Sequence, residues 1–514
     1  MPCTLPMRRR LPGNCGVGRS ARRLAGAALV AAACWTAWPC LAAEEVAVPP
    51  PRPNVLLLLV DDLKPALGCY GADWARTPHM DRLARRGMRF DRAYCNQALC
   101  APSRNSLLVG ARPTSLGIYS LELNFRRRFP DAVTLPQYFR RHGYRAEGVG
   151  KVFHIGHGNA GDPESWSVPF QAERAVGYAI PGNSRGGLTR EEAYFSNQAL
   201  DRVASLPRGP AWERADVADE AYADGRIAAE GIRRLRAARE RQEPFFLALG
   251  FVKPHLPFCA PARYWDLYDP AELPQPAWEQ PPVDAPAYAG KTLGELSQYE
   301  PAPLEPPLDA SLKRTLIHGY FASVSYVDAQ IGKVLDELAR LELEATTIVV
   351  LWGDHGFHLG DHGAWTKHTN YEEANRIPLA IVAPGTTTRG SSTLALVESV
   401  DLYPTLAELA GLPAPDGPQP RDGKSLVSLL KDPAAVVRDH AFHCYPRGKR
   451  LGRAIRTDRY RLVEWRSTVD AEEPAEYELY DYEVDPLETR NLARALPEVR
   501  DRLAAVLAVH PPPR

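Results

Sequence analysis

The chain lacks an excess of either charge. Of its 514 residues, 62 are Lys or Arg and 62 are Asp or Glu, so the formal net charge is zero. A balanced charge gives no electrostatic argument for nucleic acid or an anionic membrane as a partner. Internal repeats and low-complexity segments are also missing from the sequence. These absences indicate a globular protein, and the length allows one large domain and a smaller one.

Cysteine is scarce beyond the N-terminal region. Four of the nine cysteines fall within the first 43 residues. The other five are scattered and show neither a disulfide framework nor the paired spacing of a zinc site. These five are Cys69, Cys95, Cys100, Cys259 and Cys444. Because five is an odd number, at least one is predicted to be free or modified.

Long apolar runs are rare as well. Only Leu24 to Ala42 approaches the ~20 residues of a membrane span. It follows an arginine-rich start and ends at Leu41-Ala42-Ala43, a small-residue cleavage site, so residues 1–43 are predicted to be a signal peptide. A membrane anchor, a lipoprotein site at Cys34 and a twin-arginine signal at Arg22-Arg23 are alternatives. The predicted location is secreted or periplasmic, with a Pro-rich linker over residues 44–53.

The rest of the chain alternates strand-like and helical segments. Apolar runs at residues 54–60, 144–149, 244–251 and 346–352 are typical of strands buried on both faces of a parallel sheet. A further apolar run covers residues 378–382. Helical patterns cover residues 78–86, 134–141, 218–241, 312–338 and 401–410. The sequence therefore predicts an α/β fold over residues 54–435, with a large, mostly parallel sheet flanked by helices.

The tail has a different character. Short strand-like runs at 442–445, 454–457, 460–465 and 477–482 follow one another closely, and a helical segment covers 496–509. We expect a smaller C-terminal subdomain over residues 436–514, built on an antiparallel sheet.

Four of the predicted strands end in polar residues. These are Asp61-Asp62, Lys151 with His154, Lys253 with His255, and Asp354-His355. Taken singly, each could be a helix cap, a surface lysine or a loop histidine. Ligands bind beyond the carboxyl ends of parallel strands, and adjacent carboxylates need a counter-charge such as a hard cation. The four strand ends together therefore predict a metal-containing site at one edge of the sheet.

The stretch Cys100-Ala101-Pro102-Ser103-Arg104 is the second signal. Pro102 suits the first turn of a helix and Gly110 suits its end, so Cys100 should lie just before a helix N-terminus, beside Arg104. Such a position is electropositive and favours an anion. A buried structural cysteine is the alternative for this position.

The pentapeptide has the Cys-x-Pro-x-Arg form of the sulfatase signature, and further segments extend the likeness. They are 54–71 (NVLLLLVDDLKPALGCYG), 100–112, 150–154 (GKVFH), 253–258 (KPHLPF), 320–328 (YFASVSYVD), 354–367, and two motifs in the tail, 478–481 and 485–488. The chain thus resembles the sulfatases of the alkaline-phosphatase superfamily, and within them the iduronate-2-sulfatase group. Residues 156–240 and 265–310 match poorly.

The resemblance implies a site that the residues alone do not establish. Cys100 would be oxidised to formylglycine by a formylglycine-generating enzyme. One Ca²⁺ would be held by the modified Cys100 and by Asp61, Asp62, Asp354 and His355. His358 and His362 lie nearby in sequence and are expected to be loop histidines.

The resemblance also implies roles for the cationic residues. Arg104, Lys151 and Lys367 would neutralise the sulfate oxygens, His255 would be the general acid, and His154 the base. Lys151, His255 and Lys367 would contact the substrate, a sulfated carbohydrate such as a 2-O-sulfated uronic acid of a glycosaminoglycan. Three alternatives stay open: a phosphate or phosphonate monoester hydrolase of the same superfamily, a non-catalytic glycan-binding relative, and a plain cysteine hydrolase.

Overall fold

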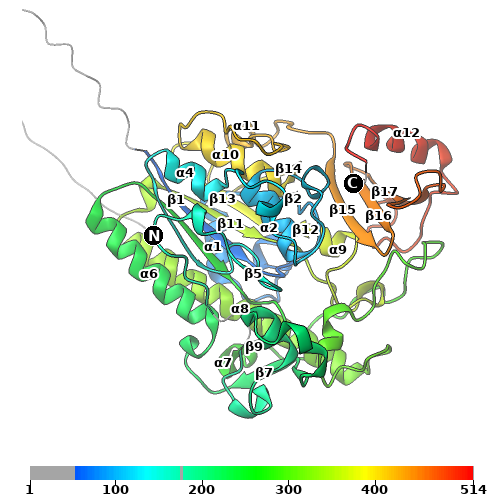
Figure 1. The fold of residues 1–514 in the computed structure, drawn as a ribbon, viewed down its shortest axis with the longest axis horizontal. Helices are drawn as coiled ribbons and strands as arrows, with labels where there is room; N and C mark the ends of the chain where they lie inside the picture. Colours follow the sequence, from blue (N-terminus) through cyan, green and yellow to red (C-terminus); the bar gives the residue numbers. More distant parts are fainter. Residues whose placement is uncertain (1–51, 174–176, 513–514) are drawn as a thin grey trace, which may run out of the picture. The chain divides into compact units, whose positions relative to one another are not determined.

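The computed structural model describes residues 52–173 and 177–512 (Figure 1). The predicted signal peptide, residues 1–43, and most of the predicted linker lie outside the described residues. Across the described ranges, no helix has both the length and the apolar character needed to cross a membrane. The cysteines at 69, 95, 100, 259 and 444 are all free thiols.

A central sheet of eight strands organises the fold. Its order is β12-β2-β13-β11-β1-β8-β3, and β14 also pairs with β2. The bounds are β1 (Asn54–Val60), β2 (Met88–Tyr94), β3 (Arg145–Gly150), β8 (Phe245–Phe251), β11 (Thr347–Gly353), β12 (Arg376–Ile377), β13 (Leu379–Val382) and β14 (Ser391–Glu398). Strands β11, β1, β8 and β3 run parallel, whereas β13 is antiparallel to β11. The predicted mostly parallel α/β sheet is confirmed.

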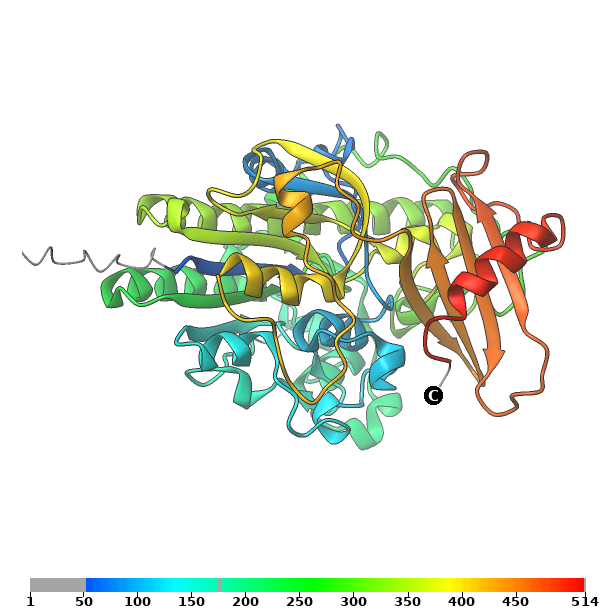
Figure 2. The ribbon, with the colours of Figure 1, turned by 90° about the horizontal axis from the view of Figure 1, so that it is seen from above.

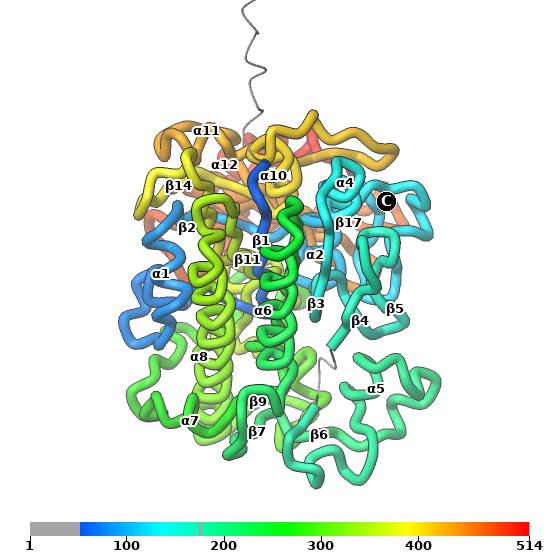
Figure 3. The backbone as a smooth tube through the Cα atoms, turned by 90° about the vertical axis from the view of Figure 1, so that its left-hand side faces the viewer, coloured from blue at the N-terminus to red at the C-terminus, as the bar shows by residue number. Residues whose placement is uncertain are grey.

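Strand β1 shows why the apolar runs are uninterrupted. Leu56, Leu58 and Val60 belong to a hydrophobic cluster that also contains residues of α6 (Ala223–Arg241) and α8 (Ala310–Arg340). The alternate residues of β1 belong to a second cluster with α2 (Cys100–Val109), α4 (Leu135–Arg141) and α10 (Leu402–Leu409). Figure 3 shows α6 and α8 side by side in front of β1 and β11. Helices on both faces therefore bury every position of the strand.

The long predicted elements are confirmed, with shifts at their ends. Helix α1 (Pro78–Arg86) has the predicted bounds, and α4 starts after Thr134, whose side chain forms a capping box with Gln137. Helix α6 begins five residues later than predicted, because residues Asp219–Ala221 form a separate 3-10 turn. Strands β2 and β14 were not predicted, since half-exposed polar residues interrupt their apolar pattern.

The C-terminal sheet is antiparallel, as predicted (Figure 2). Its strands are β15 (Ala441–Arg447), β16 (Arg450–Arg456), β17 (Tyr460–Ser467) and β18 (Glu476–Asp481). Helix α12 (Pro497–Leu507) packs on it through Leu503 and Leu507. Phe442 and Cys444 of β15 bond to Asn96, four residues before α2. This sheet therefore lies beside the loop that leads into Cys100.

Short elements fill the connections. They are α3 (Pro113–Leu116), β4 (Ile155–Gly156), β5 (Asn159–Ala160), α5 (Arg190–Ser196), β6 (Gly209–Pro210), β7 (Trp212–Ala215), β9 (Phe258–Pro261), α7 (Ala262–Trp265), β10 (Tyr299–Glu300), α9 (Glu372–Asn375) and α11 (Val427–Lys431). Most of those between residues 155 and 300 belong to the segments for which the sequence had little signal.

Candidate functional site

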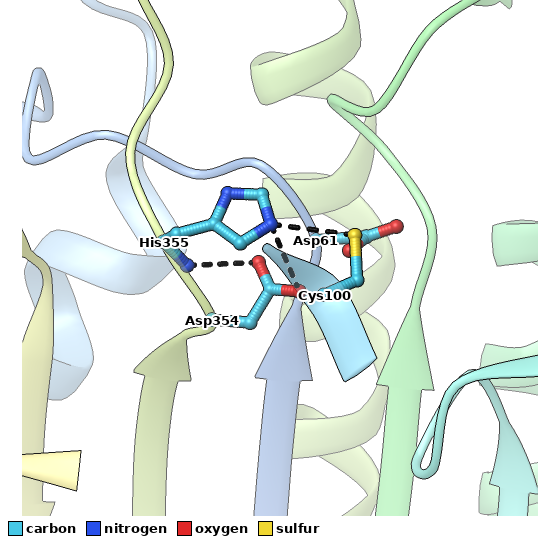
Figure 4. A group of neighbouring side chains, drawn as sticks. All are labelled: Asp61, Cys100, Asp354 and His355. Atoms are coloured by element: carbon cyan, nitrogen blue, oxygen red, sulfur yellow. Dashed lines mark hydrogen bonds and ion pairs between the residues drawn. The ribbon is translucent and has the colours of Figure 1, made fainter. Parts of the chain in front are cut away.

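Cys100 is the first residue of α2, one position further into the helix than predicted. Leu99 before it is extended, and Gly110 ends the helix in the left-handed conformation, as its sequence position suggested. The Cys100 side chain is buried, and its Sγ lies 3.3 Å from His355 Nε2 (Figure 4). The same Sγ lies 3.7 Å from Lys151 Nζ. The cysteine of the pentapeptide thus meets residues that follow β11 and β3.

Two carboxylates beside Cys100 share one guanidinium. Arg104 Nη2 lies 3.0 Å from both Asp61 Oδ1 and Asp354 Oδ2, and all three side chains are fully buried. Burial alone would raise the pKa of Asp61, but Lys151 and Arg104 together hold it well below its ordinary value. Burial and the Asp61 charge raise the pKa of Asp354. The neighbouring carboxyl groups of Asp61 and Asp354 therefore have pKa values shifted in opposite directions.

Arg104, predicted to neutralise the sulfate oxygens, makes its contacts with carboxylates and backbone carbonyl oxygens. Its Nε donates to Asp354 Oδ2 at 3.1 Å, and Nη1 donates to the carbonyl oxygens of Lys151 and Val152. Together with Asp61, these acceptors engage all three of its nitrogens. The geometry therefore assigns Arg104 to holding the carboxylates and the turn after β3. Burial and Asp61 raise the pKa of the Cys100 thiol, and the charges of Lys151 and Lys367 oppose this rise.

Asp62 carries an oxygen that no hydrogen-bond donor satisfies. Its Oδ2 accepts from Lys367 Nζ at 3.0 Å, whereas the buried Oδ1 has no partner within the described residues. The His355 Nε2 atom lies 3.5 Å from this Oδ1. The backbone of Asp62 is left-handed, with φ of 58°, which turns the side chain back toward the strand edge. Burial raises the pKa of Asp62 to about 7, despite the opposing effect of Lys367.

The donor set around Cys100 fits a hard divalent cation. Ligand atoms of Asp61, Cys100, Asp354 and His355 lie within 4.8 Å of one another, and those of Asp61, Asp62, Cys100 and His255 do so as well. His355 Nδ1 bonds to the carbonyl of Gly356 at 3.0 Å, which assigns the proton to Nδ1 and leaves Nε2 facing the carboxylates. Arg104, Lys151 and Lys367 pair with these carboxylates, yet Asp62 Oδ1 keeps no hydrogen-bond donor among the described residues, and oxygen-rich sites of this kind favour a hard cation.

The other predicted residues border this cluster, with one addition. Glu295 was not predicted, yet its Oε1 lies 3.2 Å from His255 Nε2 and its Oε2 lies 2.5 Å from Lys367 Nζ. His255 Nδ1 bonds to the Leu256 carbonyl at 2.6 Å. Lys151 pairs with Asp61. His255, Lys151 and Lys367 thus surround Cys100 as predicted, and Glu295 links two of them.

His154 lies beside His157 and Phe195. Its Nε2 lies 3.1 Å from His157 Nδ1, and its own Nδ1 is buried without a partner in the described structure. Phe195 of α5 joins it to the site, because the Phe195 ring lies 6.1 Å from the ring of His154, 5.3 Å from that of His255, and 4.7 Å from Lys151 Nζ. Burial and the Lys151 charge lower the pKa of His154.

Sequence reasoning missed Glu295, Phe195 and Glu191. All three come from the segments that match the family poorly, and no motif surrounds them. Glu191 is buried, and its burial and the nearby Glu295 raise its pKa to about 8. His358 and His362, predicted to be loop histidines, contact residues other than those around Cys100. His358 Nε2 bonds to Thr369 at 2.8 Å, and the His362 ring lies tilted against the Tyr371 ring, with ring centres 4.6 Å apart.

Comparisons with known proteins agree with the motifs. A family model described as "Sulfatase" matches residues 53–412, and one described as "N-sulphoglucosamine sulphohydrolase, C-terminal" matches residues 360–508. An iduronate 2-sulfatase of Mus musculus is 32% identical, covering 85% of this chain and 90% of its own length. A sulfatase of Formosa agariphila is 29% identical, covering 90% and 86%. The structure of a phosphonate monoester hydrolase from Silicibacter pomeroyi shares the fold, with a TM-score of 0.68, 24% identity, and coverage of 89% and 95%.

Proposed function

The chain belongs to the sulfatase family and is a sulfuric ester hydrolase, and we propose that it is a formylglycine-dependent enzyme acting on a sulfated carbohydrate. One observation carries the proposal. The Cys of Cys100-Ala101-Pro102-Ser103-Arg104 lies at a helix start, with its Sγ 3.3 Å from His355 Nε2, inside a cluster of three buried carboxylates. This arrangement supports the proposal that residue 100 is modified and lies beside a bound cation.

The proposed modification gives Cys100 a different chemistry. A formylglycine-generating enzyme would oxidise it to an aldehyde, whose hydrate would offer one hydroxyl to attack sulfur and a second to expel sulfate. A plain cysteine hydrolase needs a low-pKa thiolate, whereas burial and Asp61 raise the pKa of Cys100. Because the thiol stays protonated, the surroundings favour the modified residue over that alternative.

A single Ca²⁺ is proposed at the carboxylate cluster. Asp61, Asp62, Asp354, His355 and the modified residue 100 would hold it, and Mg²⁺ is the alternative ion for these ligands. A cation here would lower the pKa of a bound hydroxyl and withdraw charge from the sulfate ester. Arg104 balances part of the carboxylate charge from the protein side, and Ser103 bonds to the Asp354 carbonyl at 2.5 Å, which orients that residue.

The remaining side chains are proposed to neutralise the charge of the sulfate group and to transfer protons. Lys151 and Lys367, whose ammonium groups face the cluster, would neutralise the sulfate oxygens. His255 would protonate the leaving alcohol, since its Nδ1 is fixed by the Leu256 carbonyl and Nε2 points toward Glu295 and the site. His154 would be the base for regenerating the aldehyde, assisted by its contact with His157.

The proposed substrate is a 2-O-sulfated uronic acid within a glycosaminoglycan or similar polysaccharide. The supporting observation is the 32% identity to iduronate 2-sulfatases of mouse and human over most of both chains. Export through the predicted signal peptide would place the enzyme outside the cytoplasm, where such polysaccharides occur. A screen of sulfated oligosaccharides with released sulfate measured would test this, and a preference for neutral sulfated sugars would contradict it.

The first test concerns position 100. Mass spectrometry of the peptide containing Cys100, from protein made in its native host, should show the lower mass of the aldehyde. An unmodified thiol would contradict the proposed mechanism and favour a non-catalytic glycan-binding protein.

A phosphonate or phosphate monoester hydrolase is the second candidate. The fold it shares with the Silicibacter pomeroyi enzyme favours its consideration, and the same cluster would serve both reactions. Paired aryl sulfate and aryl phosphate substrates separate the two, because a large preference for phosphate would contradict a sulfatase. Inactivation by thiol alkylation together with indifference to chelators would instead indicate a cysteine hydrolase.

A further inference from the structure

Residues 288–295, here called the strap, run between the C-terminal sheet and the loop that carries Lys367. Ala289 packs with Ala454, Val463 and Trp465 of that sheet. The carbonyl of Thr292 accepts from the Trp365 amide at 2.6 Å, and Glu295 binds Lys367. Anchored at these points, the strap places its side chains next to the candidate active site.

Arg447, the last residue of β15, reaches the strap from the other side. Its Nε donates to the Tyr288 carbonyl at 2.9 Å, Nη2 donates to the carbonyl of His368, and the guanidinium lies 4.6 Å from the centre of the Tyr445 ring. All of these partners are neutral. Among the described residues Arg447 has no carboxylate within ion-pair distance, although its side chain is partly buried.

Lys291 of the strap adds a second unbalanced charge. Lys291 is exposed and makes no hydrogen bond or ion pair with any described residue. Partial desolvation and the Arg447 charge lower its pKa, and the Glu295 charge opposes them. His368 Nδ1 is buried without a partner in the same part of the structure. Burial raises the pKa of Tyr445 to about 12, while the charges of Arg447 and Lys367 lower it, so these groups share one electrostatic environment.

Within the described residues, fully buried arginines pair with acids, whereas the partly buried Arg447, like the partly buried Arg208, has only neutral partners. Arg461 pairs with Glu372 and Glu488, and Arg112 pairs with Glu398. Glu295 neutralises Lys367. A partly buried guanidinium near a lysine, without an acid to balance it, is unfavourable unless a bound anion supplies the charge.

We propose that Arg447 and Lys291 form an anion subsite that holds a second anionic group on the sugar whose sulfate ester reaches Cys100. The inference rests on the proposed function and names the residues that would bind the second anionic group of its substrate. A guanidinium binds planar carboxylates and sulfates through two parallel hydrogen bonds. The carboxylate of a uronic acid and a second sulfate share this chemistry, and the substrates in the test separate them.

The test uses the full-length, formylglycine-containing protein and three methyl glycosides. The first is a 2-O-sulfated uronic acid, the second is the same sugar with its carboxylate reduced to an alcohol, and the third carries a second sulfate in place of the carboxylate. Arg447→Gln should lower kcat/KM on the uronic acid by about 10- to 100-fold, the range for a hydrogen bond to a charged group. It should change turnover of the reduced sugar far less.

Arg466→Gln is the matched control, because Arg466 is half-exposed on β17 of the same sheet and pairs with Glu464. It should leave the preference for the acid over the reduced sugar as in the wild type. If Arg447→Gln fails to fold in a thermal-unfolding assay, Lys291→Gln at an exposed position provides the same comparison. A loss by the Arg447 variant on the disulfated sugar as well would show that either anion fills the subsite.

Two results would overturn the subsite, and they are distinguishable. If the wild type hydrolyses the acid and the reduced sugar with equal efficiency, the subsite is wrong while the sulfatase function stands. If no sulfate ester is hydrolysed, including 4-nitrophenyl sulfate, the proposed function fails and the subsite fails with it.

Discussion

At the scale of single residues, position 100 separates the proposed chemistry from its alternatives. Cys100 is buried between His355 and Lys151, and its thiol has a raised pKa. Cys100→Ala should abolish sulfate release in any host, because no aldehyde can form. Cys100→Ser should be inactive wherever the modifying enzyme accepts only cysteine. Released sulfate and the mass of the peptide should be measured together, and full activity with an alanine would refute the mechanism.

Arg104 illustrates how a residue of the signature acquires its role from its contacts. Arg104→Gln leaves Asp61 and Asp354 buried without their shared counterion, so we expect the free energy of unfolding to fall by roughly 3–5 kcal/mol. Urea denaturation in the presence of a chelator measures this loss without help from a bound cation.

Arg466→Gln is the control for that measurement and should stay within about 0.5 kcal/mol of the wild type, since Arg466 is half-exposed and Glu464 keeps its ion pair with Arg453. If Arg104→Gln unfolds like the wild type and only binds sulfate more weakly, Arg104 contacts the sulfate as the sequence first suggested.

At the scale of elements, the strap depends on a glycine. Gly294 has φ of 51°, and a Cβ there would lie 2.3 Å from the Thr366 hydroxyl oxygen, which is buried beside Lys367. Gly294→Ala must therefore shift Glu295 or Lys367, and we expect kcat/KM for an aryl sulfate to fall by about tenfold or more, since misplaced catalytic groups have large effects.

The matched control lies four residues earlier on the same strap. A Cβ at Gly290 would meet nothing within 4 Å, and its φ is not in the left-handed region. Gly290→Ala should therefore keep wild-type kinetics. Equal activity in both variants would show that the strap does not position the site.

At the scale of the whole molecule, buried ion pairs join the two sheets. Glu398 at the end of β14 binds Arg112, near the end of α2, and Arg438, just before β15. Burial alone would raise the pKa of Glu398, but the two arginines outweigh it and lower the pKa to about 2. The stabilisation is therefore present above the unfolded pKa of about 4.3 and is lost as the pH falls through the folded value.

Glu398→Gln should lower the free energy of unfolding by about 3–5 kcal/mol at pH 7, because Arg112 loses its acid and Arg438 keeps only Asp401. The difference from the wild type should shrink as the pH falls from about 5 toward 2, where Glu398 becomes protonated. Urea denaturation at several pH values measures it, with Asp458→Asn as the surface control, since Asp458 is 83% exposed. A pH-independent difference would contradict the assignment.

The proposed cation should stabilise the whole fold. Three buried carboxylates without it repel one another, so Tm should rise with Ca²⁺ concentration and fall in a chelator. At 100 times Kd a bound ion contributes about 2.7 kcal/mol. Differential scanning calorimetry with Ca²⁺, Mg²⁺ and Zn²⁺ should rank the ions, and a Tm indifferent to all three would argue against a metal at Asp61, Asp62, Asp354 and His355.

The sequence by itself determined the central sheet and the inner half of the site. An apolar run buried on both faces is typical of a central strand in a parallel sheet. The carboxyl ends of the parallel strands β1, β3, β8 and β11 lie at one edge, where Asp61, Lys151, His255 and Asp354 follow them. Short-range signals also placed the end of α2 at Gly110 and the antiparallel tail. These features follow from local pattern and from the geometry of parallel strands.

Only the tertiary structure decided the rest. The direction of the Arg104 guanidinium, the contact of Glu295 with His255 and Lys367, and the position of Arg447 above the strap all join residues far apart in the chain. No periodicity or spacing encodes which of several possible partners a long polar side chain meets. That choice depends on burial and on the charges already present, and both exist only after the loops have packed against the sheet.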